Sequence, residues 1–420
     1  MMRAKALPTV VCVMIAVLLA LPVAAENNGT AISPAGATAS PQLKAGRAGV
    51  CMIGAGLAST LLYPYFEVDL ADPNGVTTLI SVNNGLNVPV MTRLVVWTDW
   101  GIPTMAFDIW LDGFDVQPIN VRLLFQGIVP STATGVDLSA FPFCDSSPPS
   151  YTNPALTNVE IQHLATAHTG QPGHIDDLCY GADHGDNIAR GYITIDTVDQ
   201  CSDIEGHDPF YTPANTSYPY FAEGGAASGI ATVNNTLWGD VIYVDFNNDS
   251  AQGSEAVAIW ADDAEFTASD IYTFYGRHSA YDGSDERVPL PYRWDQRFLN
   301  GGPFAGGADL IVFQQPHHSG TSPISCVDHP GWWPMETGVN TLDEAAGNIE
   351  TFATDLFPLV TQRVPISTVG PSYDFGWIQI QGNTLQQMWV QPILTAGGRF
   401  SAGYNGFPVE FLCGMAPPTN

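Results

Sequence analysis

Bulky apolar residues alternate with polar ones in five short stretches of the N-terminal part of the chain, a period of two that predicts β-strands. The stretches are residues 63–70, 77–82, 88–97, 106–111 and 116–124. Segments 72–75 and 112–113, rich in Asp, Asn, Gly and Pro, separate neighbouring stretches and are turn signals. Five strands joined by short turns indicate an antiparallel sandwich.

The pattern is less regular in the middle of the chain and returns to strands near its C-terminus. Strands are predicted at residues 192–198, 240–246, 308–313, 363–369, 377–381, 388–393 and 400–404. Thr157 followed by Glu160 fits a helix capping box, and an apolar face then continues to Gly170. Residues 341–356 form a second helix candidate, although Gly347 weakens it.

These elements predict a mainly β fold, an antiparallel, Ig-like β-sandwich built from N- and C-terminal strands around a large, loop-rich central insertion. The expected segments are a signal peptide at 1–25, a flexible N-terminus at 26–48, the N-terminal sandwich strands at 49–140, an α+β insertion at 141–357 and the C-terminal sandwich strands at 358–420. Two consecutive domains are the competing layout.

The first 25 residues have the three regions of a secretory signal. Arg3 and Lys5 precede an apolar run at residues 10–21, and small residues lead to a predicted cleavage before Glu26. The run of about 12 residues is shorter than the roughly 20 that a membrane helix needs, which disfavours a retained anchor. We therefore expect a secreted protein (periplasmic, extracellular or at the cell surface) without a membrane span after signal cleavage.

The chain is strongly acidic, with a formal net charge of −29 that includes the two basic residues of the predicted signal. Such a charge repels nucleic acid and anionic membrane surfaces and favours cations as partners. Hydrophobic residues make up 45% of the chain and aromatic residues 11%, which is enough for a packed core and argues against a disordered chain.

Seven cysteines are present, and removal of Cys12 with the signal would leave six. They are Cys51, Cys144, Cys179, Cys201, Cys326 and Cys413. An even number in an exported chain predicts three disulfides, with 15 possible connectivities. Cys179 with Cys201 is the favoured pair because the two are nearest in sequence, and Cys51 with Cys413 would join the two ends of the sandwich.

Five segments of the chain resemble a family of secreted bacterial proteins of unknown function. They are YPYFEVDL at residues 63–70, TTLISVNN at 77–84, WTDWG at 97–101, HGDNIARGY at 184–192 and DFGW at 374–377. The resemblance extends over most of the expected mature chain and implies export and a shared fold. It implies no activity.

Oxygen-bearing side chains at alternate positions, Asp245, Asn247 and Asp249, suit a hard cation such as calcium. Glu255 completes the candidate set, although it lies one residue before the position of the bidentate Glu in an EF-hand loop. The competing interpretation is a hairpin turn rich in Asn and Asp.

Other polar clusters have structural explanations that compete with a site. His184, near His163, His168 and several acids, could bind a transition metal or lie in a surface loop of hydrogen-bonded histidines. Two groups combine tryptophan with acids, as sugar-binding clefts and glycosidases do, or else mark solvated strand ends. They are Trp260 with Asp262, Asp263 and Glu265, and Trp332 and Trp333 with Glu336. Trp97, Asp99 and Trp100 are interpreted as a strand end and turn.

No motif of a serine hydrolase, zinc protease or nucleotide-binding loop is present in the sequence. We therefore predict a non-enzymatic secreted protein with a role in binding, adhesion or the cell envelope. Its partner would be an unknown ligand, such as a glycan or another envelope protein. An extracellular hydrolase acting on polysaccharide is the alternative.

Overall fold

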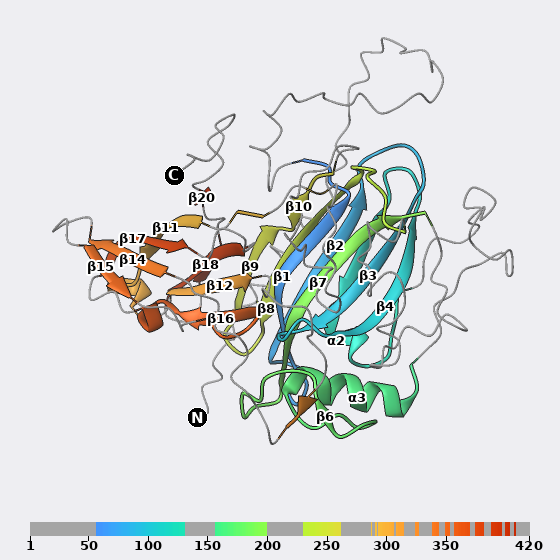
Figure 1. Ribbon diagram of the computed structural model, residues 1–420, viewed down its shortest axis with the longest axis horizontal. Helices are drawn as coiled ribbons and strands as arrows, with labels where there is room; N and C mark the ends of the chain where they lie inside the picture. The colour runs from blue at the N-terminus through green and yellow to red at the C-terminus, as the bar shows by residue number, and fades with distance from the viewer. Residues whose placement is uncertain are drawn as a thin grey trace, which may run out of the picture. The chain divides into compact units, whose positions relative to one another are not determined.

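The strands of this protein form antiparallel sheets in a computed structural model (Figure 1). All described residues lie in the unit Arg47–Asn420. They are residues 56–130, 156–199, 230–261, 287, 290–291, 293–305, 308–314, 324–326, 338–343, 349–352, 357–369, 374–381, 388–396, 400–403 and 407–408. The predicted signal peptide and N-terminal tail lie outside them.

Two sheets face each other and form a sandwich. Sheet 1 has the order β10-β1-β7-β3-β4, with β1 (Thr60–Asp69), β3 (Val90–Thr98), β4 (Pro103–Leu111), β7 (Ile188–Val198) and β10 (Val257–Ile259). Sheet 2 has the order β5-β2-β8-β9, with β2 (Val76–Asn84), β5 (Val116–Asn120), β8 (Leu237–Asp245) and β9 (Ser250–Glu255). Side chains alternate between the two faces of each strand, and Phe66, Val82 and Val241 lie in one buried cluster between the sheets.

The opposite side of sheet 1 is also buried, so its central strands are apolar on both faces. That side shares a second core with two further sheets. Sheet 3 is β16-β12-β18-β19, with β12 (Ala308–Gln314), β16 (Thr361–Pro365), β18 (Met388–Ala396) and β19 (Phe400–Gly403). Sheet 4 is β15-β14-β17-β11-β20, with β11 (Arg293–Leu299), β14 (Gly338–Asp343), β15 (Ile349–Phe352), β17 (Phe375–Gln381) and β20 (Phe407–Pro408).

A continuous aromatic contact joins sheets 1 and 3. Trp97 stacks on Tyr192 with ring centroids 5.6 Å apart, and Tyr192 meets the edge of Phe313 at 5.1 Å. Trp294 and Trp389 make a similar contact at 4.6 Å between sheets 4 and 3. Such pairs add stabilisation beyond their buried area, so they fix these sheets against one another.

A single arginine closes the turn that connects β1 of sheet 1 to β2 of sheet 2. Arg122, in the short helix α2 (Val121–Leu124), donates to the backbone oxygens of Asp69, Asp72, Gly75 and Val76. These four acceptors belong to the β1–β2 turn, which would otherwise leave them to solvent. The neighbouring edge strand β5 contains Pro118, and its pairing with β2 continues on both sides of that residue.

Helix α3 (Asn158–Thr169) packs on β7 and β4, and Figure 1 shows it crossing below one end of the strands. The predicted capping box is confirmed, because Thr157 Oγ1 accepts from Glu160 N and the Glu160 carboxylate accepts from Thr157 N. Gly170 ends the helix in the left-handed conformation, at φ 72°. A side chain there would meet the backbone of Ala182 and Asp183 at 2.2 Å, so only glycine fits.

The mainly β, antiparallel sandwich is confirmed, and 54% of the described residues are in strands and 11% in helices. The strand pairing differs in detail from the expected layout. Strands β7 to β10 lie in the region predicted as a central insertion, yet they complete sheets 1 and 2. Strands β16, β18 and β19 instead form sheet 3 with β12, and β17 pairs with β11 and β14 in sheet 4. β7 pairs with β1 on one edge and β3 on the other, and its apolar residues on both faces fit a sheet that is covered by a core on each side.

The helix predicted at residues 341–356 is wrong. Strands β14 and β15 pair antiparallel in this region, and β14 also pairs with β17 over its whole length. Val339, Thr341, Ile349 and Thr351 are β-branched, and such residues favour the extended strand over the helix.

Among the described residues, no helix has the length and apolarity needed to cross a membrane.

Candidate functional site

The outward side of sheet 2 carries apolar side chains that are open to solvent. On β8, alternation turns Trp238, Asp240 and Ile242 outward, while Val241 and Tyr243 point into the core. Trp238 is 44% exposed, and Ile242 is 41% exposed. We define the sheet 2 face by the outward residues Ser81, Asn83, Val116, Trp238, Asp240 and Ile242.

Small neighbours explain why this face is uncovered. In the pairing of β8 with β9, Ile242 lies opposite Gly253, which has no side chain to shield it. Strand β9 ends at Glu255, opposite Asp240, so Trp238 extends past the end of its neighbour. On the other side Trp238 pairs with Asn83, which in turn pairs with the exposed Val116.

A polar strip divides the apolar residues of the sheet 2 face. Ser81 Oγ accepts from Asn83 Nδ2 at 3.2 Å and from Asp240 N at 3.3 Å, and it lies 3.4 Å from Asp240 Oδ2. Asn83 Nδ2 also donates to the backbone oxygen of Trp238. The Asn83 amide oxygen is buried and has no hydrogen-bonding partner in the portion of the chain that the structure describes.

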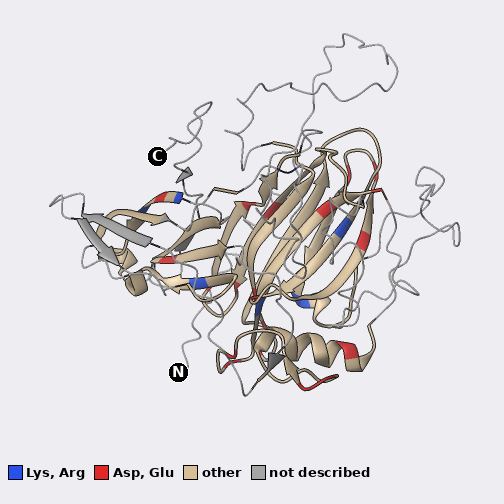
Figure 2. Cartoon of the chain, in the orientation of Figure 1, with Lys and Arg blue, Asp and Glu red and all other residues tan. Residues whose placement is uncertain are grey.

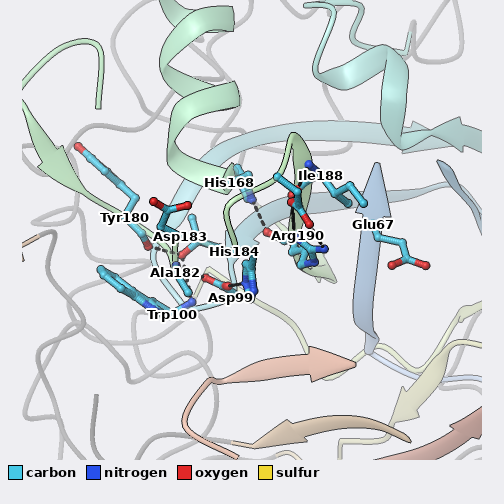
Figure 3. Close-up of polar contacts among 12 residues, drawn as sticks. Glu67, Asp99, Trp100, His168, Tyr180, Ala182, Asp183, His184, Ile188 and Arg190 are labelled. Atoms are coloured by element: carbon cyan, nitrogen blue, oxygen red, sulfur yellow. Dashed lines mark hydrogen bonds and ion pairs between the residues drawn. The ribbon is translucent and has the colours of Figure 1, made fainter. Parts of the chain in front are cut away.

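A second polar group lies at the β3–β4 turn and is shown in Figure 3. Asp99 is buried, and its carboxylate accepts from Ala182 N at 3.0 Å and contacts His184 Nε2 at 2.9 Å. The Asp99 backbone oxygen accepts from Val360 N at 2.9 Å. One residue therefore joins three segments that are far apart in sequence, including the WTDWG and HGDNIARGY segments.

A carboxylate that orients an imidazole is also the arrangement of a general base or of a metal-binding histidine. Within the described ranges, no hydroxyl or thiol contacts His184, and no group of three or more His, Cys, Asp or Glu residues is placed to hold a metal ion. Trp97, Asp99 and Trp100 form the predicted strand end and turn. We interpret the Asp99–His184 contact as positional, because it fixes the loop before β7.

A disulfide links this loop to a distant region of the chain. Cys179 and Cys326 are bonded, and short strands β6 (Leu178–Cys179) and β13 (Ile324–Ser325) pair beside them. The predicted pairing of Cys179 with Cys201 is therefore wrong. Sequence distance misled the prediction, because pairing of β6 with β13 brings the Cα atoms of residues 147 positions apart to 5.2 Å. Cys51, Cys144, Cys201 and Cys413 lie outside the described residues.

His163 and His168 lie on the predicted helix α3 and are buried. His168 Nδ1 donates to the backbone oxygen of Arg190 at 2.8 Å, which leaves Nε2 to accept from Thr104 Oγ1 at 2.7 Å. Both ring nitrogens of the neutral form are satisfied. Burial lowers the pKa of His168 to about 4, with a smaller opposing effect from the Arg190 hydrogen bond.

We expect the protein to lose stability on acidification through His168. In the unfolded chain its pKa is near 6.5, so between about pH 6.5 and pH 4 the unfolded state binds a proton that the folded state does not. The free energy of unfolding falls by about 3 kcal/mol over this window and then levels off. Urea titrations at pH 7, 5.5 and 4 measure the loss.

His168→Gln should remove most of that pH-dependent loss, and His184→Gln, at a partly exposed histidine, serves as the control. Equal acid sensitivity in wild type and His168→Gln would contradict the assignment to His168.

The side of sheet 1 that faces away from sheet 2 contains a buried charge cluster, which we call the buried charge row. Thr60, Asp196, Arg93 and Asp108 are cross-strand neighbours on β1, β7, β3 and β4. Arg93 Nε lies 2.9 Å from Asp108 Oδ1, Thr60 donates to Asp196, and Arg287 Nε donates to Thr60 Oγ1 at 2.7 Å. All five side chains are buried, and the two arginines balance the two acids, which gives the row a structural role.

The predicted calcium residues fall in the β8–β9 hairpin. Asp245 Oδ1 accepts from Asn247 N and Asn248 N, Asp245 Oδ2 accepts from Asn248 Nδ2, and Asn247 Nδ2 donates to Asp72 Oδ2 at 2.9 Å. Asp249 adopts a positive φ of 50°. Glu255 pairs with Asp240 at the far end of β9, whereas Asp245 pairs with Ser250. The side-chain hydrogen bonds account for the turn without a cation, and calcium binding stays a prediction.

The remaining candidate acids cannot be placed. Asp262, Asp263, Glu265, Trp332, Trp333 and Glu336 lie outside the described residues.

The sheet 2 face was missed by sequence reasoning, although one signal was present: the β8 pattern puts Trp238 and Ile242 on the same side as Asp240, not with Val241 and Tyr243. Sequence alone did not show which side of β8 faces solvent, because that depends on how sheet 2 packs on sheet 1.

Comparison of the chain with family models, with curated proteins and with solved structures finds no match. The class that the structure defines is therefore an antiparallel β-sandwich with an exposed apolar sheet face. The resemblance to a family of secreted bacterial proteins stays a prediction.

Proposed function

We propose that this chain is an exported, non-enzymatic protein that attaches to cell-envelope or extracellular material through the sheet 2 face. The observation that carries the proposal is the pair of large apolar side chains on one strand, Trp238 and Ile242, each more than 40% exposed. The two side chains lie on either side of Asp240, so the face combines exposed large apolar groups with polar ones, as interaction sites do. Aromatic residues of this kind also dominate binding energy at interfaces.

Export is supported by the predicted signal at residues 1–25 and by the Cys179–Cys326 disulfide, since disulfides persist in oxidising compartments. An acidic chain with a formal charge of −29 also suits a role away from nucleic acid. A polysaccharide hydrolase remains the alternative prediction.

Cosedimentation with envelope material of the producing cell tests the proposal. We expect wild-type protein to pellet with the envelope fraction and the double variant Trp238→Ser, Ile242→Ser to pellet at roughly a tenth of that amount or less, because such anchors carry most of an interface's energy. Both substitutions are on the surface, so the thermal midpoint should change little.

Phe375→Ser is the matched control. Phe375 is also 44% exposed but lies on β17 of sheet 4, so its loss should leave cosedimentation unchanged. Equal pelleting of wild type and the Trp238, Ile242 double variant would overturn the proposed surface.

A further inference from the structure

The sheet 2 face combines an indole surface with hydrogen-bonding groups in a narrow strip. Successive outward residues of a strand are two positions apart, so Trp238 and Ile242 are separated by about 14 Å along β8, with Asp240 between them. Asn83 and Ser81 lie on the adjacent strand, about 5 Å away across the sheet. An occupant must therefore present apolar and hydroxyl-rich surface side by side.

Sugar rings have this character. A pyranose exposes C–H groups on its faces and hydroxyl groups around its rim. The C–H faces pack on aromatic rings, whose faces carry partial negative charge. The hydroxyls both donate and accept, which matches the half-buried Asp240 carboxylate and the Ser81 hydroxyl 3.4 Å from it. A purely apolar partner would leave these polar groups desolvated and unpaired, at a cost of about 1–3 kcal/mol each.

Charge restricts the class of glycan further. Asp240 lies within the face, and Glu255 is exposed beside it at the end of β9. Figure 2 shows acidic residues distributed over the strands and loops, with the described basic residues interspersed among them. An anionic polysaccharide would meet like charge here, as would a second copy of this chain at −29.

We infer that the sheet 2 face binds a neutral polysaccharide, with Trp238 as the stacking platform and Ser81 with Asp240 as the hydrogen-bonding element. This inference rests on the proposed function and names its ligand class. Binding to an extended chain of sugars also fits the row of residues along β8, which offers contacts over several successive positions.

Calorimetric titration of the purified protein tests the inference with four defined probes. Cellohexaose, xylohexaose and mannohexaose are neutral, and hexagalacturonate is the anionic counterpart. We expect at least one neutral probe to bind and hexagalacturonate to bind more weakly than that probe. Trp238→Ala should weaken binding by roughly tenfold or more, as the loss of an aromatic anchor does. Asp240→Ala should also weaken it, and Phe375→Ala should have no effect.

Absence of heat with all three neutral probes, unchanged affinity in Trp238→Ala, or equal affinity for hexagalacturonate would overturn the inference. The two proposals remain separable in these outcomes. If no neutral probe binds while envelope cosedimentation still depends on Trp238 and Ile242, the glycan class is wrong and the attachment surface stands. If cosedimentation is also unaffected by those variants, both proposals fail.

Discussion

Replacing Asp108 by leucine will lower the free energy of unfolding by about 3–5 kcal/mol, which is the usual cost of removing one member of a buried ion pair. Asp108 and Arg93 are both almost fully buried, with side chains 2% and 4% exposed, and their atoms approach to 2.9 Å. Removal of the carboxylate leaves the Arg93 guanidinium in the interior with less compensation. Urea unfolding followed by tryptophan fluorescence measures the change.

A double-mutant cycle separates this effect from simple loss of packing. The double variant Arg93→Met, Asp108→Leu removes both charges and keeps apolar volume. Its loss in free energy of unfolding should be smaller than the sum of the two single losses by about 0.5–3 kcal/mol. The double variant should still be less stable than wild type, because Asp196 also lies beside Arg93 in the buried charge row. Without Arg93, Arg287 is the one arginine of the row that remains to balance the Asp196 charge. Strict additivity of the two single effects would contradict a coupled pair.

Loss of the Cys179–Cys326 bond is the other large effect that we expect. The bond closes a loop of 147 residues, and the chain-entropy model assigns about 5 kcal/mol to a loop of that length. Cys179 is buried with Trp100 and Tyr180 in a small apolar cluster, so the α3–β7 loop should loosen as well. The paired variant Cys179→Ala, Cys326→Ala should unfold at a clearly lower urea concentration than the oxidised wild type.

Reduction of wild-type protein with dithiothreitol provides the comparison for that variant. The reducing agent should lower the stability of wild type and should change the paired variant less, because the bond is already missing there. If the paired variant unfolds at the same urea concentration as wild type, the bond does not stabilise the fold.

Local features of the fold were predictable from sequence, and long-range ones were not. Thr157, Glu160 and Gly170 define α3 through interactions within a few residues, so their pattern is sufficient. The same holds for β1 to β5, β7 and β8, which were predicted from local residue patterns, whereas β9 and β10 were not predicted. The partner of a strand is a property of the whole chain, which is why β7 and β10 were assigned to an insertion although they pair with β1.

The candidate surface illustrates the same limit. Alternation showed two sides of β8, one with Trp238 and Ile242 and the other with Val241 and Tyr243, and both are apolar. Only the stacking of sheet 2 on sheet 1 decides which side is buried. The contact of Asp99 with His184, 85 positions apart, likewise depends on the loop before β7 folding back on the β3–β4 turn.

Pro118 on the edge strand β5 affects how this molecule meets other copies of itself. An open strand edge with free N–H groups invites an extended segment from a neighbour to continue the sheet, and an exposed apolar face would favour such stacking. Proline has no N–H to offer, and edge strands are where a sheet tolerates it. At this edge, growth of the sheet by addition of strands is discouraged, so the open face beside Pro118 can stay exposed with less risk of fibrous aggregation.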